Sequence, residues 1–312
     1  MLYSRVLITG ANGMLGQELV AMMSKNPMYD VLATGRDPVP RYSGGAGGYV
    51  PLDITDAEQM NRLFQDFTPD VVVNCAAMTQ VDECEEKRDL CWQINADAVE
   101  NIARACKSIG SRLVQVSTDF VFDGEDGPYN EKARPRPLNY YGRSKQAGEN
   151  AARIAGLDQW AIARTVLVYG APEGATRSNI ALWVINELSN GRRINVVTDQ
   201  WRTPTYAADL ADGIERIIRF DKTGTFHLSG REFMSVYDFA RIIAREFDLD
   251  ENLIGPTDST RFTQTAARPP RTGFIILKAE SELGYKPRPV EHALRDLKHR
   301  LGLSITSRID PR

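Results

Sequence analysis

The segment VLITGANGMLG, residues 6–16, decides the fold class because it joins an apolar, strand-like run to a helical pattern through three glycines. Glycine permits the tight turn and lets backbone N–H groups approach a pyrophosphate at the positive N-terminus of a helix. The spacing is G-x-x-G-x-x-G rather than G-x-G-x-x-G, so the glycines alone would also fit an ordinary strand-to-helix turn. Their place at the first strand-helix junction favours a bound dinucleotide. The contacts that we expect are Gly10, Gly13, Met14, Leu15 and Gly16.

The chain continues to alternate strands and helices as far as about residue 170. Apolar runs such as DVVVNCAA (70–77), RLVQVS (112–117) and WAIARTVLVYG (160–170) show no regular polar alternation. This is typical of strands in a parallel sheet that is covered on both faces. A helical pattern from about residue 89 to residue 109 separates two of these runs. The sequence therefore predicts an α/β fold with a Rossmann-like, doubly wound parallel sheet.

After about residue 170 the pattern loosens into helical stretches with short extended pieces between them, such as INVVTD (194–199) and TFHLSG (225–230). We expect residues 1–170 to form an NAD(P)-binding domain. Residues 171–312 are expected to form a smaller C-terminal substrate-binding lobe, from which a strand or helix can cross back to the first domain. The expected helices of this lobe span about residues 179–189, 206–219, 235–247 and 290–302.

The composition argues against several classes of partner. With 38 basic and 41 acidic residues the formal net charge is −3, which gives no general attraction to nucleic acid or anionic lipid. We find no stretch near the roughly 20 apolar residues of a membrane helix, and no signal-peptide pattern. The four cysteines form no C-x-x-C pair and the three histidines are scattered, so we expect no metal site. We expect a cytoplasmic protein with reduced thiols.

The end of the second strand indicates which dinucleotide is bound. The run DVLATGRD (30–37) ends at Gly35 and Arg36, where an Asp or Glu would bind the ribose diol of NAD. An arginine can instead pair with the 2′-phosphate of NADP, although a solvated surface arginine would give the same pattern. Because Asp37, an acid that could bind the ribose diol, lies next to Arg36, NAD(H) stays an alternative cofactor. The prediction is that NADP(H) is preferred and NAD(H) is possible.

A third extended run ends in PLDIT (51–55), where Asp53 and Ile54 are candidate cofactor contacts. Asp53 is well placed to accept a hydrogen bond from the adenine amino group. An acidic residue at the start of a helix would explain Asp53 almost as well.

The stretch NYYGRSKQAGEN, residues 139–150, contains the candidate reactive groups. Residues four apart share a helix face and residues five apart do not, so Lys145 pairs with Tyr141 rather than with Tyr140. An ammonium close to a phenol is expected to lower the phenol pKa from about 10, which suits proton exchange with a carbonyl near neutral pH. Tyr-x-x-x-Lys alone would equally describe a surface pair, so its surroundings must decide.

Those surroundings come from VQVSTDFVFDG (114–124), a strand whose carboxyl end carries Ser117, Thr118 and Asp119. Ligands of open parallel sheets bind beyond the carboxyl ends of the strands, so a hydroxyl group here can polarise a substrate carbonyl. The alternative for these hydroxyls is a local turn or cap hydrogen bond.

In this order, the glycine turn, the strand-end hydroxyl and Tyr-x-x-x-Lys resemble the short-chain dehydrogenase/reductase superfamily, in its extended branch that acts on nucleotide sugars. Within that branch the chain is most similar to the dTDP-4-dehydrorhamnose reductase family. NCAAMTQVDECE (74–85) resembles its N-x-A-A-x-T-x-V-D-x-x-E segment, and STDFVFDG (117–124) its S-T-D-Y-V-F-D-G. YGRSKQAGE (141–149) resembles its Y-G-x-[ST]-K-x-x-G-E, and DQWRTPTYAADLA (199–211) the loop that leads into its substrate lobe.

The resemblance implies a role for each matching residue. Tyr141 would donate a proton to the reduced carbonyl oxygen, Lys145 would lower its pKa and bind the nicotinamide ribose, and Thr118 would hydrogen-bond the substrate. Three residues after the fourth strand would line the path of the adenine ribose and pyrophosphate, namely Ala76, Ala77 and Met78. The other candidate contacts to the sugar nucleotide are Asp119, Thr203, Thr205 and Arg268.

The residues around the tyrosine favour a reductase. Sugar 4,6-dehydratases carry a Glu after the strand-end Asp, whereas this chain has Phe120, which argues against dehydration. The expected function is NAD(P)H-dependent reduction of a 4-keto group on a nucleotide-activated deoxysugar, as from dTDP-4-dehydrorhamnose to dTDP-rhamnose. The resemblance also makes a homodimer possible. Leu167 replaces a Trp that is usual in the family and RPPRTGFIIL (268–277) replaces its RPxxSxLD, so the identity of the sugar stays open.

Two alternatives stay open. A nucleotide-sugar epimerase of the same superfamily would keep NAD bound through its cycle, whereas a net reductase must exchange its cofactor. The regulatory β subunit of methionine adenosyltransferase also resembles this family, so the fold can serve as a non-catalytic, NADP-binding subunit. The intact set of Tyr141, Lys145 and Thr118 argues against a purely binding role.

Overall fold

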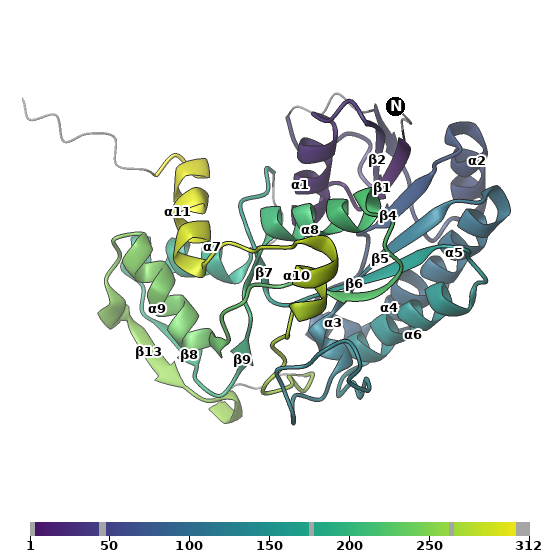
Figure 1. The fold of residues 1–312 in the computed structure, drawn as a ribbon. Helices are drawn as coiled ribbons and strands as arrows, with labels where there is room; N and C mark the ends of the chain where they lie inside the picture. Colours follow the sequence, from purple (N-terminus) through teal and green to yellow (C-terminus); the bar gives the residue numbers. More distant parts are fainter. Residues whose placement is uncertain (1–3, 44–47, 175–177, 262–264, 304–312) are drawn as a thin grey trace, which may run out of the picture.

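The computed structural model describes residues 4–43, 48–174, 178–261 and 265–303. Within these residues, seven strands form one parallel sheet in the order β11-β6-β5-β4-β1-β2-β3 (Figure 1). From β3 to β6 this is the strand order of a doubly wound dinucleotide-binding fold, so the predicted fold class is confirmed. The strands are β1 (Ser4–Thr9), β2 (Tyr29–Gly35), β3 (Gly48–Pro51), β4 (Val71–Asn74), β5 (Arg112–Thr118), β6 (Trp160–Thr165) and β11 (Gly224–His227).

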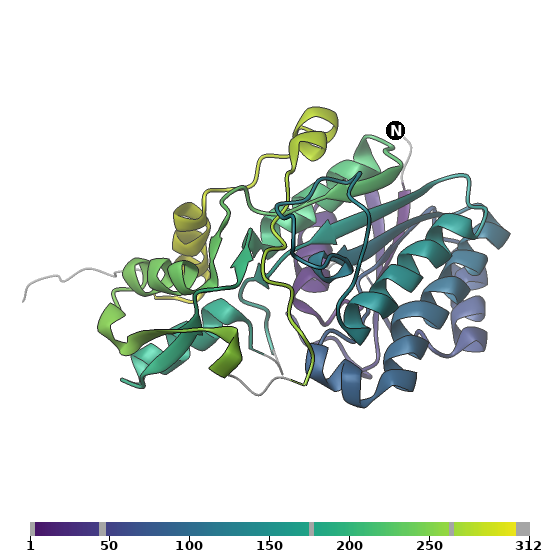
Figure 2. The ribbon, with the colours of Figure 1, turned by 90° about the horizontal axis from the view of Figure 1, so that it is seen from below.

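Helices cover both faces of this sheet (Figure 2). One face carries α1 (Met14–Met23) and α8 (Ala207–Arg219), and the other carries α2 (Ala57–Phe67), α5 (Ala98–Ile109) and α6 (Tyr140–Ile154). Successive strand side chains point to opposite faces, so Val6 and Ile8 pack in the first core while Leu7 packs in the second. All three side chains are fully buried, which explains the absence of polar alternation in the sequence.

The helix expected from about residue 89 to residue 109 begins nearby but is not regular. It consists of α4 (Arg88–Trp92), a π-helical turn over Gln93–Asp97 and α5, and it follows a short helix, α3 (Val81–Glu86), that the sequence did not predict. The side chain of Asn95, in the π-helical turn, bonds to the backbone N–H and C=O of Met78, both at 2.9 Å. The irregular turn therefore holds the loop after β4, in agreement with the frequent use of such turns at functional sites.

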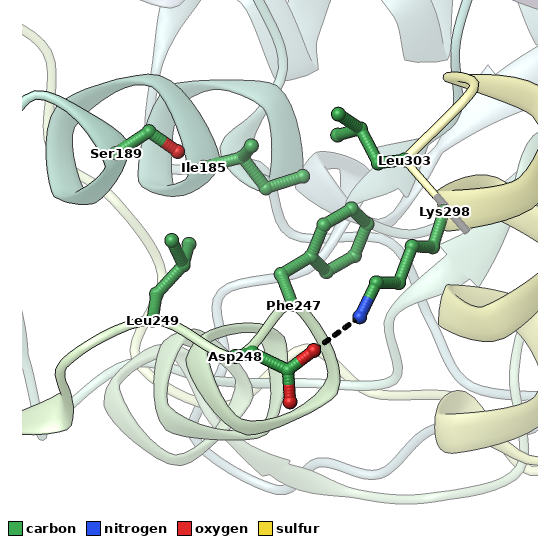
Figure 3. Close-up of a pocket in the computed structure, with 7 residues that line it drawn as sticks. All are labelled: Ile185, Ser189, Phe247, Asp248, Leu249, Lys298 and Leu303. Atoms are coloured by element: carbon green, nitrogen blue, oxygen red, sulfur yellow. Dashed lines mark hydrogen bonds and ion pairs between the residues drawn. The ribbon is translucent and has the colours of Figure 1, made fainter. Parts of the chain in front are cut away.

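The second lobe has a core of its own, formed by α7 (Ile180–Ser189), α9 (Val236–Glu246) and α11 (Val290–Arg300) against β8 (Ile194–Val197) and β13 (Ile254–Thr257). A shallow cavity of about 180 Å³ lies between these helices, where Lys298 pairs with Asp248 at 2.6 Å (Figure 3). The predicted helices of this part of the chain agree with α7, α8, α9 and α11 to within two residues at each end.

The chain returns to the large sheet after residue 170. Helix α8 packs beside α1, and β11 extends the sheet next to β6. Helix α10 (Leu277–Leu283) contacts both α8 and β11. The division at residue 170 therefore stays a prediction. Two further strand pairs are short: β7 (Val168–Tyr169) pairs with β10 (Thr205–Tyr206), and β9 (Trp201–Arg202) pairs with β12 (Met234–Ser235). Short 3₁₀ turns span Asp119–Val121, Glu251–Leu253 and Ser259–Arg261. None of the described helices is both long and apolar enough to cross a membrane.

Candidate active site

A cleft of about 300 Å³ opens at the carboxyl ends of the sheet strands, where parallel sheets bind ligands. Residues from α1, α3, β5, α6 and β6 contribute to it, together with the loop after β4, the segment after β6 and α8. The lining residues are Met14, Leu15, Cys75, Ala77, Thr79, Val81, Val116, Ser117, Thr118, Asp119, Phe120, Tyr141, Lys145, Thr165, Leu167, Val168 and Leu210.

The glycine turn at one end of the cleft leaves no room for side chains. Gly10 has φ +66°, and a Cβ on it would lie 2.7 Å from the backbone nitrogen of Ala76. A Cβ on Gly16 would lie 2.4 Å from the carbonyl oxygen of Gly10. Helix α1 begins directly after Gly13, which provides no side-chain cap, so its first N–H groups are available to an anion. The turn therefore fits a dinucleotide pyrophosphate, as the sequence predicts.

At the end of β2, Arg36 is exposed while the neighbouring Asp37 is engaged. The carboxylate of Asp37 accepts hydrogen bonds from Arg41 at 2.9 Å and from Asn12 at 2.7 Å. These contacts, above all that with Arg41, lower the pKa of Asp37. An acid already occupied in this way is poorly suited to bind a ribose diol, whereas the exposed guanidinium of Arg36 suits a 2′-phosphate.

The predicted adenine contacts lie on the loop before α2. Asp53 is exposed, and its Oδ1 accepts from the backbone N–H and the hydroxyl of Thr55, at 2.9 and 2.8 Å. The side chain of Ile54 is buried in the core beneath the sheet. The N-cap of α2 is Asp56, and Asp53 bonds to Thr55 just before it, so the helix start stays an alternative explanation for Asp53. Its contact with adenine stays a prediction.

The loop after β4 holds Ala76, Ala77 and Met78 beside the glycine turn. The backbone N–H of Ala76 donates to the Thr9 hydroxyl at 3.4 Å, and Ala77 lines the cleft. Met78 is buried, and its backbone is bonded by Asn95. The structure thus places this loop between the glycine turn and the strand-end residues of β5, where a dinucleotide would cross.

Helix α6 positions the two predicted reactive groups. Its first turn is held by Asn139, whose side chain accepts from the N–H of Gly142 at 2.8 Å, and by Glu85, which accepts from the N–H of Tyr140 at 2.6 Å. Tyr141 and Lys145 then both line the cleft, whereas the ring of Tyr140 lies by Trp92, outside the cleft lining, with 6.2 Å between the ring centroids. This arrangement agrees with the helical spacing that selected Tyr141, and the catalytic role of Tyr141 stays a prediction.

Tyr141 contacts the strand-end hydroxyl that the sequence singled out. A hydrogen bond links its side chain to that of Thr118, and its ring meets the ring of Phe120 edge-on at 5.7 Å. Burial raises the pKa of Tyr141 above its usual value of 10. The lowering of this pKa that the sequence led us to expect is therefore wrong. The physical reason is that the phenol is excluded from water while the ammonium of Lys145 donates to the carbonyl oxygen of Val116, at 2.8 Å.

Lys145 lies in a buried, charged environment. Burial lowers its pKa from 10.5 to about 8, and the carboxylate of Glu149, one helical turn further on, opposes this shift. Glu149 is fully buried and accepts two hydrogen bonds from Arg164 of β6, both at 2.7 Å. Although burial acts to raise the pKa of Glu149, the contacts with Arg164 and other neighbours leave it lowered. The cleft is therefore lined both by a protonated phenol and by an ammonium group with a moderately lowered pKa.

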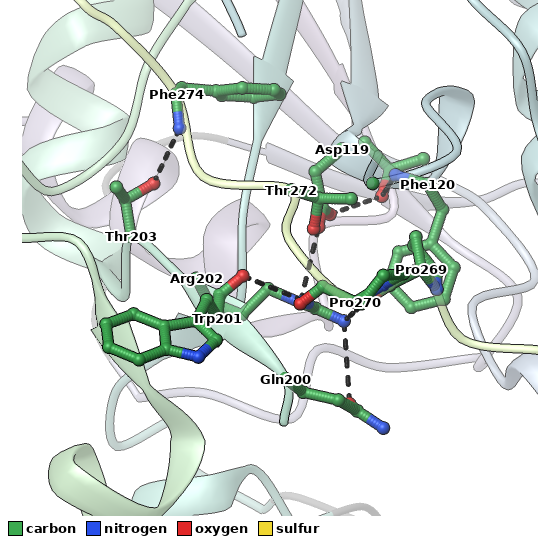
Figure 4. A network of polar contacts seen from close by, with 12 residues as sticks. Asp119, Phe120, Gln200, Trp201, Arg202, Thr203, Pro269, Pro270, Thr272 and Phe274 are labelled. Atoms are coloured by element: carbon green, nitrogen blue, oxygen red, sulfur yellow. Dashed lines mark hydrogen bonds and ion pairs between the residues drawn. The ribbon is translucent and has the colours of Figure 1, made fainter. Parts of the chain in front are cut away.

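Asp119 lies at the edge of the cleft, in a network that reaches the second lobe (Figure 4). Its carboxylate accepts from the Thr118 hydroxyl at 3.1 Å and from the Thr272 hydroxyl, and it lies 3.6 Å from Nε of Arg202. Burial raises the pKa of Asp119. Because protein groups surround this carboxylate, the network orients Thr118, and a direct contact of Asp119 with a substrate stays a prediction.

The other predicted substrate residues are not among those that line the cleft. Thr203 and Thr205 are buried: the Thr203 hydroxyl donates to Ser229 at 3.1 Å, and the Thr205 hydroxyl donates to the carbonyl oxygen of Thr203, also at 3.1 Å. Arg268 forms a paired contact with the carboxylate of Asp82 in α3. The Arg268 contact links the later part of the chain to α3, and the contacts of all three residues with a sugar nucleotide stay predictions.

Sequence reasoning did not single out several residues that build the site. Arg202 and Thr272 hold Asp119, and Thr165 lines the cleft opposite Thr118 in the strand register. Arg202 lies inside the motif DQWRTPT, which could have drawn attention to it. Leu167, singled out only as a departure from the family, lines the cleft with φ +41°. Such a conformation is unusual for a side-chain-bearing residue and is concentrated at functional sites.

Comparisons with known proteins agree with this geometry. The family model described as "RmlD substrate binding domain" matches residues 4–302. The chain is 35% identical over 282 residues to the dTDP-4-dehydrorhamnose reductase of Mycobacterium tuberculosis, covering 88% of this chain and 85% of the relative. It is 33% identical over 261 residues to the methionine adenosyltransferase 2 subunit beta of Bos taurus, covering 82% and 76%. The crystal structure of dTDP-4-dehydrorhamnose reductase from Bacillus anthracis in complex with NADP superimposes with a TM-score of 0.84 and 33% identity, covering 96% of this chain and 99% of that chain.

Proposed function

The chain belongs to the RmlD substrate binding domain family, and we propose that it is an NAD(P)H-dependent reductase of a 4-keto group on a nucleotide-activated deoxysugar, such as dTDP-4-dehydrorhamnose. The observation that carries this proposal is the contact between Tyr141 and Thr118 in a cleft that also contains Lys145. The similarity to reductases of this name and to an NADP complex supports it.

The residues of the chain have distinct parts in this reaction. When bound, the reduced nicotinamide supplies the hydride for the carbonyl carbon. Tyr141, whose raised pKa keeps it protonated, donates its proton to the carbonyl oxygen, and the Thr118 hydroxyl orients that oxygen. Lys145 lines the same cleft, and its positive charge would stabilise the phenolate that forms as the proton leaves. Arg36 is suited to the 2′-phosphate of NADP, and the glycine turn to the pyrophosphate.

We also infer the setting in which the reaction takes place. The cysteines in the part of the chain that the structure describes are free thiols, which supports a reducing, cytoplasmic location. The net charge of −3 favours a small-molecule substrate over nucleic acid. A homodimer stays a prediction from the family resemblance.

The test is consumption of NADPH when the purified protein meets a panel of dTDP-4-keto-6-deoxyhexoses. A Tyr141→Phe variant should retain cofactor binding and lose about 10²–10⁴-fold in kcat, because it removes the proton donor and preserves the ring. Tyr140→Phe is the matched control, since that ring lies outside the cleft lining, and its turnover should stay near that of the unaltered protein. Absence of turnover with every ketosugar nucleotide would contradict the proposal.

Similarity to the bovine methionine adenosyltransferase 2 subunit beta favours one alternative, a nucleotide-binding regulatory subunit. In that case a partner enzyme should be recovered with the protein in a constant ratio, and NADPH should bind without being consumed. The Tyr141→Phe variant would then have no effect on the activity of the partner. The same NADPH assay, run with and without the partner, separates the two functions.

A further inference from the structure

Thr165, the last residue of β6, combines two features that point to a ligand. The residue lines the cleft, and its hydroxyl is buried without a hydrogen-bond partner among the described residues. Only 8% of the residue is exposed. A buried hydroxyl that lacks a partner is unfavourable, so a native structure that contains one commonly supplies the partner from outside the chain.

The position of Thr165 in the sheet shows which part of the cleft it serves. In the parallel register of β5 and β6, Thr165 is the direct partner of Thr118, so the two side chains share one face of the sheet. Thr118 is bonded to Tyr141 and Asp119, whereas Thr165 bonds to neither. The two threonines thus lie side by side. The Thr118 hydroxyl is hydrogen-bonded, whereas the Thr165 hydroxyl has no partner among the described residues.

The order of the strands decides which end of a dinucleotide reaches Thr165. A ligand anchored at the glycine turn after β1 meets the ends of β4 and β5 before that of β6. The end of β6 lies three strand spacings, roughly 14 Å, from that of β1, on the side of β4 and β5 and opposite to β2 and β3. The lining residues follow the same path, from Met14 through Ala77 and Val116 to Thr165.

The cleft that Thr165 lines also offers apolar surface to a flat ring. Leu167 and Val168, which follow β6 in the chain, and Leu210 of α8 contribute this surface. A buried aromatic ring finds apolar contacts there, while an amide on that ring requires a hydrogen-bonding partner.

We propose that the Thr165 hydroxyl hydrogen-bonds the carboxamide of the cofactor's nicotinamide ring and thereby orients the ring toward the cleft that holds Tyr141. Thr165 is a positioning residue, since it acts on the cofactor and not on the reacting carbonyl. The inference rests on the proposed function in one respect, the use of a nicotinamide cofactor. It does not depend on which ketosugar is reduced.

The test measures binding by titration calorimetry with two ligands, NADPH and 2′-phospho-ADP-ribose, which lacks the nicotinamide. Thr165→Val keeps the shape of the side chain and removes the hydroxyl. It should weaken NADPH binding by about 5- to 10-fold, the loss of one neutral hydrogen bond, and leave the affinity for 2′-phospho-ADP-ribose unchanged. Thr165→Ser, which restores a hydroxyl, should recover most of the NADPH affinity.

Three outcomes would overturn the inference: unchanged NADPH affinity in Thr165→Val, equal weakening of both ligands, or no recovery in Thr165→Ser. A higher KM for the sugar nucleotide with unchanged NADPH affinity would assign the hydroxyl to the substrate and equally overturn it. Failure of the proposed function gives a different result, because NADPH would then bind and respond to Thr165→Val without any ketosugar being reduced.

Discussion

Two buried arginine-carboxylate pairs flank the candidate active site, and they hold their carboxylates in opposite ways. Arg164 donates two hydrogen bonds of 2.7 Å to Glu149, and the pKa of Glu149 is lowered despite its burial. Nε of Arg202 lies 3.6 Å from Asp119, and burial raises the pKa of that carboxyl. Proximity to a guanidinium therefore does not by itself decide the charge of a buried acid.

The difference comes from where each guanidinium directs its N–H groups. Arg164 gives Nε and one terminal nitrogen to Glu149 in a paired geometry. Arg202 donates instead to backbone carbonyl oxygens of Trp201, Pro269 and Pro270, at 2.8 to 3.1 Å. The first pair fixes a charge behind Lys145, whereas the second pair connects chain segments and leaves Asp119 bonded mainly by the hydroxyls of Thr118 and Thr272.

Breaking the first pair should have the largest effect on stability. Glu149→Gln leaves the buried guanidinium of Arg164 without its counter-charge, so the free energy of unfolding should fall by about 3–5 kcal/mol. Urea denaturation at neutral pH measures this change. A loss below about 1 kcal/mol, the range of an exposed ion pair, would show that the pair is not held as the geometry indicates.

Breaking the second pair should cost less. Asn at position 119 can still accept from Thr272, and Arg202 keeps its three backbone acceptors, so Asp119→Asn should lower the free energy of unfolding by about 1 kcal/mol. A loss as large as that of Glu149→Gln would contradict the contrast between the pairs.

The loss of stability in the two variants should also change with pH in opposite directions. Because the pKa of Glu149 is lowered on folding, its contribution to the free energy of unfolding is present above its ordinary pKa of 4.5 and is lost as pH falls. The loss of stability in Glu149→Gln should therefore grow with pH. Because the pKa of Asp119 is raised on folding, its contribution to the free energy of unfolding is greatest below its ordinary pKa of 3.8 and is lost as pH rises through the folded pKa. The loss of stability in Asp119→Asn should therefore decline with pH. Denaturation series at several acidic pH values measure both slopes.

The smallest effect on stability is expected for Arg153, a partly exposed residue that also contacts Glu149. Arg153 also donates to Glu149, at 2.8 Å, but 27% of its side chain is exposed, so water screens the contact. Arg153→Met should lower the free energy of unfolding by about 0.2–1 kcal/mol, which the same urea experiment measures. A loss comparable to that of Glu149→Gln would mean that Arg153, and not Arg164, is the principal partner.

The sequence predicted the parts of the molecule whose properties follow from near neighbours in the chain. Continuous apolar runs indicated strands buried on both faces, and the observed strand order agrees. The four-residue spacing selected Tyr141 over Tyr140, because an α-helix places side chains four apart on one face. The irregular turn around Asn95 could not be predicted in this way, because it is held by the loop after β4.

By itself, the sequence determined the α/β fold class, the glycine turn and the common helix face of Tyr141 and Lys145, since each follows from local patterns in the chain. Only the tertiary structure decided that the phenol of Tyr141 has a raised pKa, that Arg268 engages Asp82, and that the hydroxyl of Thr165 is buried without a partner. These properties depend on the exclusion of water and on contacts between distant segments, which no local spacing in the chain specifies.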